Sequence, residues 1–343
     1  MYRAGFSILL GLLLAGCGRA LPGASFSQYH EAQTMFGTVV EVDVCYAPGQ
    51  KTVLPAVYQS IWERLNQIED KISVFRDASE VSAINHSFPQ PVRVSDETRQ
   101  LIEKALRYRQ ITEGAFDISV GPLVRLWKKA GREGRLPTDE DIASTKAAIG
   151  VDVVSLAADG KIQLRHPASS IDLGAFADGY GADEVARILR AHGFSRFLIN
   201  AGGDMYAGGL NCSGRPWQLG IQHPQKKHGL ILKIAVQDRG VATSGDYEDF
   251  QEINKQHWSH IIDPRTGYPQ QGVTSATVIA PTGIDADALA TALCVLPAQQ
   301  GVALIDSLGP PFAAYIVATG KDGQLQEFYS QRFSWEARAQ KRR

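Results

Sequence analysis

The stretch His260-Ile261-Ile262-Asp263-Pro264-Arg265-Thr266-Gly267, followed by Ala286-Asp287-Ala288-Leu289-Ala290-Thr291-Ala292, is the most informative part of this chain. The first segment predicts a strand that ends in a polar turn, because two Ile residues precede Asp-Pro and Thr-Gly. The second predicts a helix on which Asp287 and Thr291 stand four positions apart, so that their oxygens share one face. A histidine at a strand end and an oxygen pair on a helix together suggest a small metal and acid/base site.

The bulk composition is that of an ordinary globular protein. The chain has 343 residues, of which 44% are hydrophobic and 21% charged, and this length suits one large domain or two smaller ones. The formal net charge is -1, so nothing indicates a nucleic-acid surface. The basic C-terminal tail, residues 336–343, is interpreted as a solvated end.

The N-terminus predicts a bacterial lipoprotein. Arg3 precedes an apolar run, residues 6–14, that is too short to cross a bilayer. Leu14-Ala15-Gly16-Cys17 then resembles a lipobox. We therefore expect residues 1–16 to be a signal peptide, Cys17 to carry lipid on the periplasmic side of a bacterial membrane, and residues 17–30 to form a tether. The alternative is a plain signal peptide with an incidental cysteine, and the sequence does not choose between inner and outer membrane.

The remaining cysteines are Cys45, Cys212 and Cys294. Their wide spacing and the absence of a CxxC pair make a disulfide framework or a structural zinc site a poor interpretation. At most one pair forms a disulfide in an oxidising compartment. Cys45 falls in a predicted strand and Cys294 in a predicted helix, which favours core positions for both.

Hydrophobic periodicity predicts the α+β class, with mixed β-sheets and packed helices, for a main domain of residues 31–335. The expected helices are 53–72, 96–113, 138–149, 179–192 and 302–308. The expected strands are 38–46, 196–200, 219–221, 230–236, 276–280 and 313–319, with two short strands within 151–164. No GxGxxG motif follows the first strand, which argues against a Rossmann site.

Four further segments contain candidate ligand-binding residues. Residues 200–204 and 243–247 are candidate anion cradles because glycines allow a close backbone approach; ordinary turns are the alternative. Residues 171–180 predict a strand end and a helix start with Asp172 and Asp178, although Asp178 could serve only the helix dipole. Residues 115–123 place Phe116 and Asp117 ahead of a Gly-Pro turn; a core ring and a capping carboxylate are the alternative.

Together these segments resemble the ApbE family, the FAD:protein FMN transferases. The resemblance runs from Thr34 to about Leu296. The segments that carry it, in the family's order, are 73–75, 79–85, 116–127, 171–183, 202–204, 243–247, 260–267 and 287–291. A lipobox is also common in this family.

The resemblance implies a role for individual residues. Magnesium would be held by the backbone oxygen of Ala175 and the side chains of Asp287 and Thr291. His260 would be the general base for the acceptor hydroxyl. The implied flavin and adenine contacts are Met35, Phe36, Phe75, Ala115, Phe116, Asp117, Asp172, Asp178 and the backbone of Ile261.

The chain departs from the family pattern in four places. Some members have Tyr at Phe75, so a hydroxyl is lost there although the ring can still stack. It has Met35-Phe36-Gly37-Thr38 where many members have Met-Gly-Thr, which leaves the flavin contact uncertain by one residue. Asp178 stands where members usually have Lys or Glu. Ala290 stands where some have a further Asp, so one metal contact passes to water or is absent.

The implied reaction is Mg²⁺-dependent transfer of FMN from FAD, the substrate, to a Thr or Ser hydroxyl of a partner flavoprotein, with release of AMP. The implied acceptors are flavoprotein subunits of membrane redox complexes. Two alternatives stay open: a metal-dependent FAD pyrophosphatase and a flavin-binding lipoprotein without turnover. The sequence leaves the acceptor, the preference between Mg²⁺ and Mn²⁺, and the oligomeric state undecided.

Overall fold

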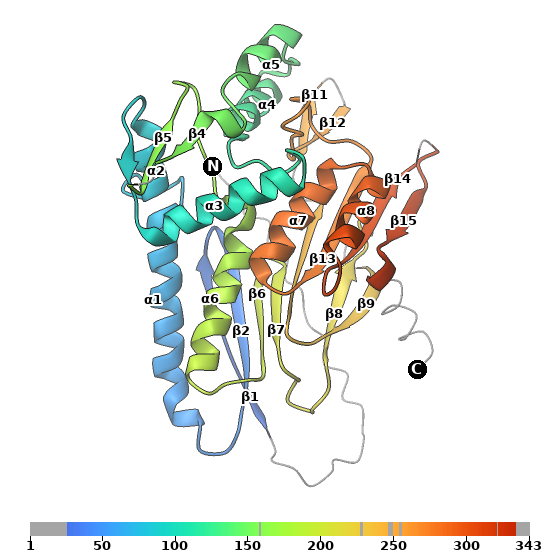
Figure 1. Cartoon of the computed structure of the whole chain (residues 1–343). Helices are drawn as coiled ribbons and strands as arrows, with labels where there is room; N and C mark the ends of the chain where they lie inside the picture. The colour runs from blue at the N-terminus through green and yellow to red at the C-terminus, as the bar shows by residue number, and fades with distance from the viewer. Residues whose placement is uncertain are drawn as a thin grey trace.

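The computed structural model of the protein describes residues 26–157, 159–226, 229–245, 250–253, 256–320 and 322–333 (Figure 1). The predicted α+β class is confirmed. An eight-stranded sheet forms the centre, and every strand pair within the described ranges is antiparallel. No helix in these ranges is both long and apolar enough to cross a membrane.

Some adjacent strands of the main sheet follow one another in the sequence, and others are joined by long connections. Their order across the sheet is β1 (Ser27–Met35), β2 (Thr38–Tyr46), β6 (Phe197–Ala201), β7 (Asp204–Gly208), β10 (Arg239–Gly245), β13 (Val273–Ala280), β14 (Ala313–Thr319) and β15 (Leu325–Tyr329). The smaller sheets are β3 (Val92–Arg93) with β5 (Lys161–Leu164) and β4 (Val154–Leu156), β8 (Trp217–Gln222) with β9 (Leu230–Val236), and β11 (Phe250–Ile253) with β12 (Gln256–Ser259).

Helices α1, α6, α7 and α8 cover one face of the main sheet, and α3 crosses above them (Figure 1). The α-helices are α1 (Leu54–Ile72), α2 (Glu80–His86), α3 (Asp96–Ile111), α4 (Gly121–Glu133), α5 (Asp139–Lys146), α6 (Ala177–Ala191), α7 (Gly283–Val295) and α8 (Ala298–Leu308). Short 3₁₀ turns are η1 (Lys51–Val53), η2 (Val151–Val153) and η3 (Gly174–Phe176). The β8–β9 hairpin packs on the opposite side of the sheet, in a second core.

The packing follows from the periodicity of each element. In α1, Val57, Ile61, Leu65 and Ile68 recur at helical spacing and are buried, which gives the helix one apolar face. Helix α7 is buried on almost every side, so it needs small residues all round and is rich in alanine. This helix packs on β10, β13 and α6.

The main sheet has two ends that matter for function. At the turn edge, Phe36 and Gly37 connect β1 to β2, and Gly202 and Gly203 connect β6 to β7. At the opposite end, which we call the root edge, β1 begins beside the end of β2: Ser27 pairs with Tyr46. Figure 1 shows the root edge at the bottom of the view.

A disulfide lies at the root edge. It joins Cys45 of β2 to Cys212 in the loop after β7, in agreement with the expectation of at most one pair among the described cysteines. Cys294 is a buried free thiol in α7. Beside the disulfide, the Arg196 guanidinium stacks 4.1 Å from the ring centre of Phe26.

Several local predictions were wrong. Strand β1 begins at Ser27, inside the segment expected to be tether. Residues 243–245 belong to strand β10 rather than to a loop, and residues 246–249 lie outside the described residues. Gly121 and Pro122 open helix α4 rather than form a turn, because proline fits the first turn of a helix, where its missing N–H has no partner to lose.

The two segments that were expected to form strand ends also differ from the prediction. Ile261 and Ile262 belong to no strand; Ile262 makes a single bridge to Pro269, because the polar turn closes at once through Asp263 N–H to the Tyr268 carbonyl, at 2.9 Å. The residues before Asp172 likewise lack strand pairing in the described structure. Asp172 N–H donates a hydrogen bond to the Ile118 carbonyl at 2.8 Å, and this bond belongs to no strand pair.

Candidate active site

A group of carboxylates meets where α6, α7 and β7 come together near the turn edge. Asp287 lies one turn into α7 and is buried, and it accepts a hydrogen bond from Gly179 N–H at 3.1 Å. Burial raises its pKa well above the ordinary 3.8, and the carboxyls of Asp204 and Asp178 raise it further. A contact between the side chains of Asp204 and Asp287 adds to this shift.

Asp178 completes the group from the first turn of α6. Its Oδ1 is buried and has no hydrogen-bond partner among the described atoms. Burial raises its pKa strongly, with smaller contributions from Asp204 and Glu69. Like-charged oxygens held in a low-dielectric position are unfavourable unless a cation or a proton offsets them. The arrangement therefore favours a bound cation.

Two glycines make this meeting possible. A Cβ on Gly179 would lie 2.4 Å from the carbonyl oxygen of Gly283 and 2.9 Å from Cβ of Asp287. A Cβ on Gly283 would lie 2.4 Å from the carbonyl oxygen of Gly179. The start of α7 is also held by Asp183, whose carboxylate accepts from Gly283 N–H at 2.6 Å and Ile284 N–H at 3.0 Å. The backbones of α6 and α7 are therefore in direct contact, which brings Asp178 and Asp287 close together.

Of the other two predicted metal ligands, Thr291 lies on α7 itself and Ala175 lies on an element that contacts α7. Thr291 is one turn beyond Asp287, and its Oγ1 is 3.4 Å from Oγ of Ser244 in β10. Ala175 is exposed within η3, which packs against α7. One carboxylate, one hydroxyl and one backbone carbonyl are hard oxygen donors, the type that Mg²⁺ prefers.

The donor set fits a hard cation of mixed ligation better than a cage of side chains. In the described part of the chain, no three His, Cys, Asp or Glu side chains are arranged to hold a metal. A site with Asp287 as its carboxylate does not require such a cage, because Mg²⁺ keeps several waters and often binds through one or two carboxylates. The unpartnered Oδ1 of Asp178 provides a nearby acceptor for such a water.

His260 directly follows β12 and is half-buried. The segment after it is rigid: Asp263 accepts from Arg265 through the backbone N–H and Nε, each at 2.9 Å, and Trp127 Nε1 donates to the Gly267 carbonyl at 2.8 Å. The Ile261 N–H donates to Ser259 Oγ at 3.1 Å and its carbonyl accepts from Gln270 N–H at 2.9 Å. A ligand contact at Ile261 must therefore use the second lone pair of the carbonyl.

The aromatic residues predicted to touch flavin differ in their exposure. Phe75 is 89% exposed in the turn after α1. Phe116 is fully buried and stacks on Phe176 at 5.9 Å between ring centres, so only its backbone can face a ligand. Met35 is buried, and Phe36, with a positive φ of 54°, packs toward Gly181. Phe75 is the most exposed of the three rings, so it is the best placed to stack on isoalloxazine.

Asp117 is held tightly and borders a cavity. It accepts from Arg109 Nε at 2.7 Å and from the backbone and hydroxyl of Ser119 at 2.8 and 2.6 Å. The cavity, about 400 Å³, is also lined by Gly114, which precedes the buried Ala115, and by the cations Lys146 and Arg265. Arg109 lines the cavity as well. Sequence reasoning missed these three cations, because they come from α3, α5 and the 260–267 segment. Asp172 is not among the residues that line this cavity, and its Oδ1 accepts a hydrogen bond from Gly174 N–H at 2.8 Å.

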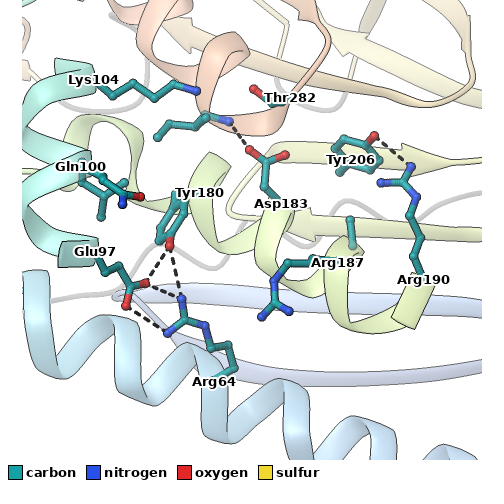
Figure 2. A pocket seen from close by; sticks show the side chains of 13 residues that line it. Arg64, Glu97, Gln100, Lys104, Tyr180, Asp183, Arg187, Arg190, Tyr206 and Thr282 are labelled. Atoms are coloured by element: carbon teal, nitrogen blue, oxygen red, sulfur yellow. Dashed lines mark hydrogen bonds and ion pairs between the residues drawn. The ribbon is translucent and has the colours of Figure 1, made fainter. Parts of the chain in front are cut away.

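A larger cavity of about 760 Å³ lies between α1, α3 and α6 and contains none of the predicted site residues (Figure 2). Its charges largely offset one another. Figure 2 shows Arg64 between Glu97 and Tyr180, and Arg64 also pairs with Glu184 at 2.8 Å. Lys104 pairs with Asp285 at 2.9 Å. These contacts tie three helices together and do not point to a charged ligand.

Comparisons with known proteins identify the family. The model of the ApbE family matches residues 36–316. The chain is 34% identical to an FAD:protein FMN transferase of Vibrio cholerae over 331 residues, which cover 94% of this chain and 95% of the relative. It is 33% identical to the protein of the same name from Salmonella typhimurium, covering 84% and 85% of the two chains.

Solved structures give the same result. The flavin transferase ApbE from Vibrio cholerae superimposes with a TM-score of 0.78 at 31% identity, covering 91% of this chain and 99% of that one. The ApbE protein from Thermotoga maritima does so with a TM-score of 0.79 at 29% identity and the same coverage. The chain therefore belongs to the ApbE family.

Proposed function

We propose that this protein transfers FMN from FAD to a Thr or Ser hydroxyl of a partner flavoprotein and releases AMP. The observation that carries the proposal is the buried Asp287, which lies beside Asp178 and Asp204 and one helical turn from Thr291. FAD carries a pyrophosphate, and its cleavage needs a cation where negative charge develops. The relatives named FAD:protein FMN transferase support this choice of substrate.

Asp287, Thr291 and the Ala175 carbonyl would hold Mg²⁺, which when bound would offset the charge on the pyrophosphate oxygens. His260 accepts the proton of the acceptor hydroxyl. The hydroxyl oxygen forms a bond to the phosphorus of the FMN half, the bridging P–O bond breaks, and AMP leaves with the bonding electron pair. Hydrogen bonds at Asp263 and Gly267 hold the backbone of the 260–267 segment, which limits the reorganisation needed next to the general base.

Phe75 would stack on the isoalloxazine, and Asp117, with Ala115 and the backbone of Phe116, would border the remainder of FAD. Asp172 and Asp178, Met35 and Phe36, and the Ile261 carbonyl stay predicted contacts. We further propose that Cys17 carries a lipid anchor on the periplasmic side of the membrane, where acceptor subunits of membrane redox complexes expose their flavinylated domains. The Cys45–Cys212 disulfide agrees with an oxidising compartment.

The test is incubation of purified protein with FAD, Mg²⁺ and an acceptor domain. Transfer predicts covalent flavin on the acceptor, seen as in-gel fluorescence, with AMP released in equal amount. An acceptor without its target hydroxyl is the control and should gain no flavin. Free FMN and AMP with an unmodified acceptor would instead mean a pyrophosphatase, and bound but intact FAD would mean a flavin-binding protein.

A further inference from the structure

The two ends of the main sheet present different charged side chains. Near the turn edge lie the carboxylates of Asp178, Asp204 and Asp287. At the root edge, four loops come together: 47–53, 191–196, 209–216 and 237–239. We call their surface the root patch. Its charged side chains are the cations Lys51, Arg196, Arg215 and Arg239 and the carboxylate Asp238.

The root patch is basic although the whole chain has a net charge of -1. Lys51 and Arg215 are exposed. The acidic contribution of Asp238 is offset by Arg190 at the end of α6, with N and O 3.3 Å apart. Such a patch attracts anionic surfaces that come within a Debye length, roughly 8–10 Å.

The chain enters the described structure at this same patch. Phe26 stacks under Arg196, and Ser27 begins β1 beside the Cys45–Cys212 disulfide. Only residues 18–25 separate Phe26 from Cys17, and eight residues reach at most roughly 28 Å. A lipid on Cys17 therefore keeps the root patch close to the bilayer, whereas the turn edge lies a full strand further away.

We propose that the root patch rests on an anionic phospholipid surface and that the turn edge points away from the bilayer. The proposal rests on the lipid anchor proposed above. Strand β1 has nine residues, and an antiparallel strand rises about 3.4 Å per residue, which places the turn edge roughly 30 Å above the headgroups. The partner must therefore present its hydroxyl from a segment that projects well beyond the membrane surface.

The experiment measures orientation on vesicles. The lipidated full-length protein is reconstituted and labelled with a fluorophore at Ser195→Cys in the root patch or at Ala78→Cys beyond the far end of α1, both exposed positions. A quencher attached to the lipid headgroup reports proximity. In vesicles that contain phosphatidylglycerol, we expect quenching at position 195 to exceed that at position 78 several-fold. Equal quenching, stronger quenching at position 78, or failure of the vesicles to retain the protein overturns the proposal.

A charge variant tests the cause. Lys51→Gln with Arg215→Gln and Arg239→Gln should remove most of the difference between the two labels in anionic vesicles. The matched control carries Lys128→Gln, Lys129→Gln and Arg132→Gln on the exposed face of α4 and should keep it. An unchanged difference in the first variant overturns the electrostatic docking. FMN transfer to a soluble acceptor in detergent should be equal in all three proteins, and its absence would concern the proposed function alone.

Discussion

The root edge and the turn edge of the main sheet are built on opposite physical principles. The root edge is closed by a disulfide, an Arg196–Phe26 stack and the paired Arg190 and Asp238. The turn edge holds like charges close together, with the pKa values of Asp178 and Asp287 raised by burial and by their neighbours. The first arrangement stabilises the folded chain, and the second is unfavourable until a ligand is present. Changes at the two ends should therefore have different consequences.

The largest effect should come from His260→Asn. Loss of the general base should slow FMN transfer by a factor of roughly 10²–10⁴ and leave FAD affinity unchanged, because the 260–267 segment is held by Asp263 and Trp127. Transfer rates and FAD titrations on the same preparation check this. A variant that unfolds at lower temperature yet transfers FMN normally below its melting point would give His260 a structural role only.

Asp287→Asn should lower the transfer rate on the order of 10²–10³-fold, since a metal ligand supplies several kcal/mol to the transition state. The amide keeps an oxygen for Gly179 N–H, so the fold should survive. Calorimetric titration with Mg²⁺ gives a readout that is independent of turnover. Wild-type Mg²⁺ affinity in the variant would exclude Asp287 as a ligand.

The same substitution has a pH signature in the metal-free protein. The pKa of Asp287 is raised by burial in the folded state, so its protonated form stabilises the folded protein. This stabilisation is fully present below the ordinary pKa of 3.8. It is lost as the pH rises through the folded pKa. Thermal unfolding in chelator should therefore show a decline with rising pH in the wild type that is smaller in Asp287→Asn.

Cys212→Ser should act on the root edge alone. Opening a disulfide that spans 167 residues typically costs about 2–4 kcal/mol of unfolding free energy. FMN transfer should stay near wild type, because the turn edge is a strand length away. Denaturant unfolding with and without reductant measures the loss, and reductant should have no further effect on the variant. If the folded variant transferred FMN more slowly than the wild type, the two edges would be coupled.

The smallest effect should come from Phe75→Ala. Aromatic stacking adds roughly 0.5–1.5 kcal/mol beyond area burial, so the Kd for FAD should rise roughly 2- to 12-fold. Stability should hardly change, because the ring is 89% exposed. Flavin fluorescence quenching provides the measurement, and an unchanged Kd would place the flavin away from this ring.

Hydrophobic patterning was sufficient for strands that are rich in apolar residues. Strands β2, β9 and β14 begin and end at the predicted residues. Helix α3 begins at its predicted residue, and Ser95 caps it by accepting from Thr98 N–H. Strand β1 was missed because it is an edge strand whose side chains are mostly exposed on both faces. Strand β10 was mistaken for a loop because Thr243, Ser244 and Gly245 are also typical of anion-binding turns.

The candidate site was predictable only in its local part. Asp287 and Thr291 share a helix face by spacing alone. The proximity of Asp204, the cations Lys146 and Arg265 beside Asp117, and the contact between Gly179 and Gly283 depend on long-range packing. Nothing in the local pattern of a single sequence encodes such contacts.

The contact between Gly179 and Gly283 also determines at which stage of synthesis and folding the site can form. The two helices that it joins are distant in sequence: Gly179 and Asp287 are 108 residues apart. A chain that has been synthesised only as far as residue 267 has Asp178 and His260 but lacks α7. It therefore cannot assemble the proposed metal site. FAD cleavage would begin only after α7 has docked on α6, so catalytic activity would report that folding has reached the C-terminal part of the chain.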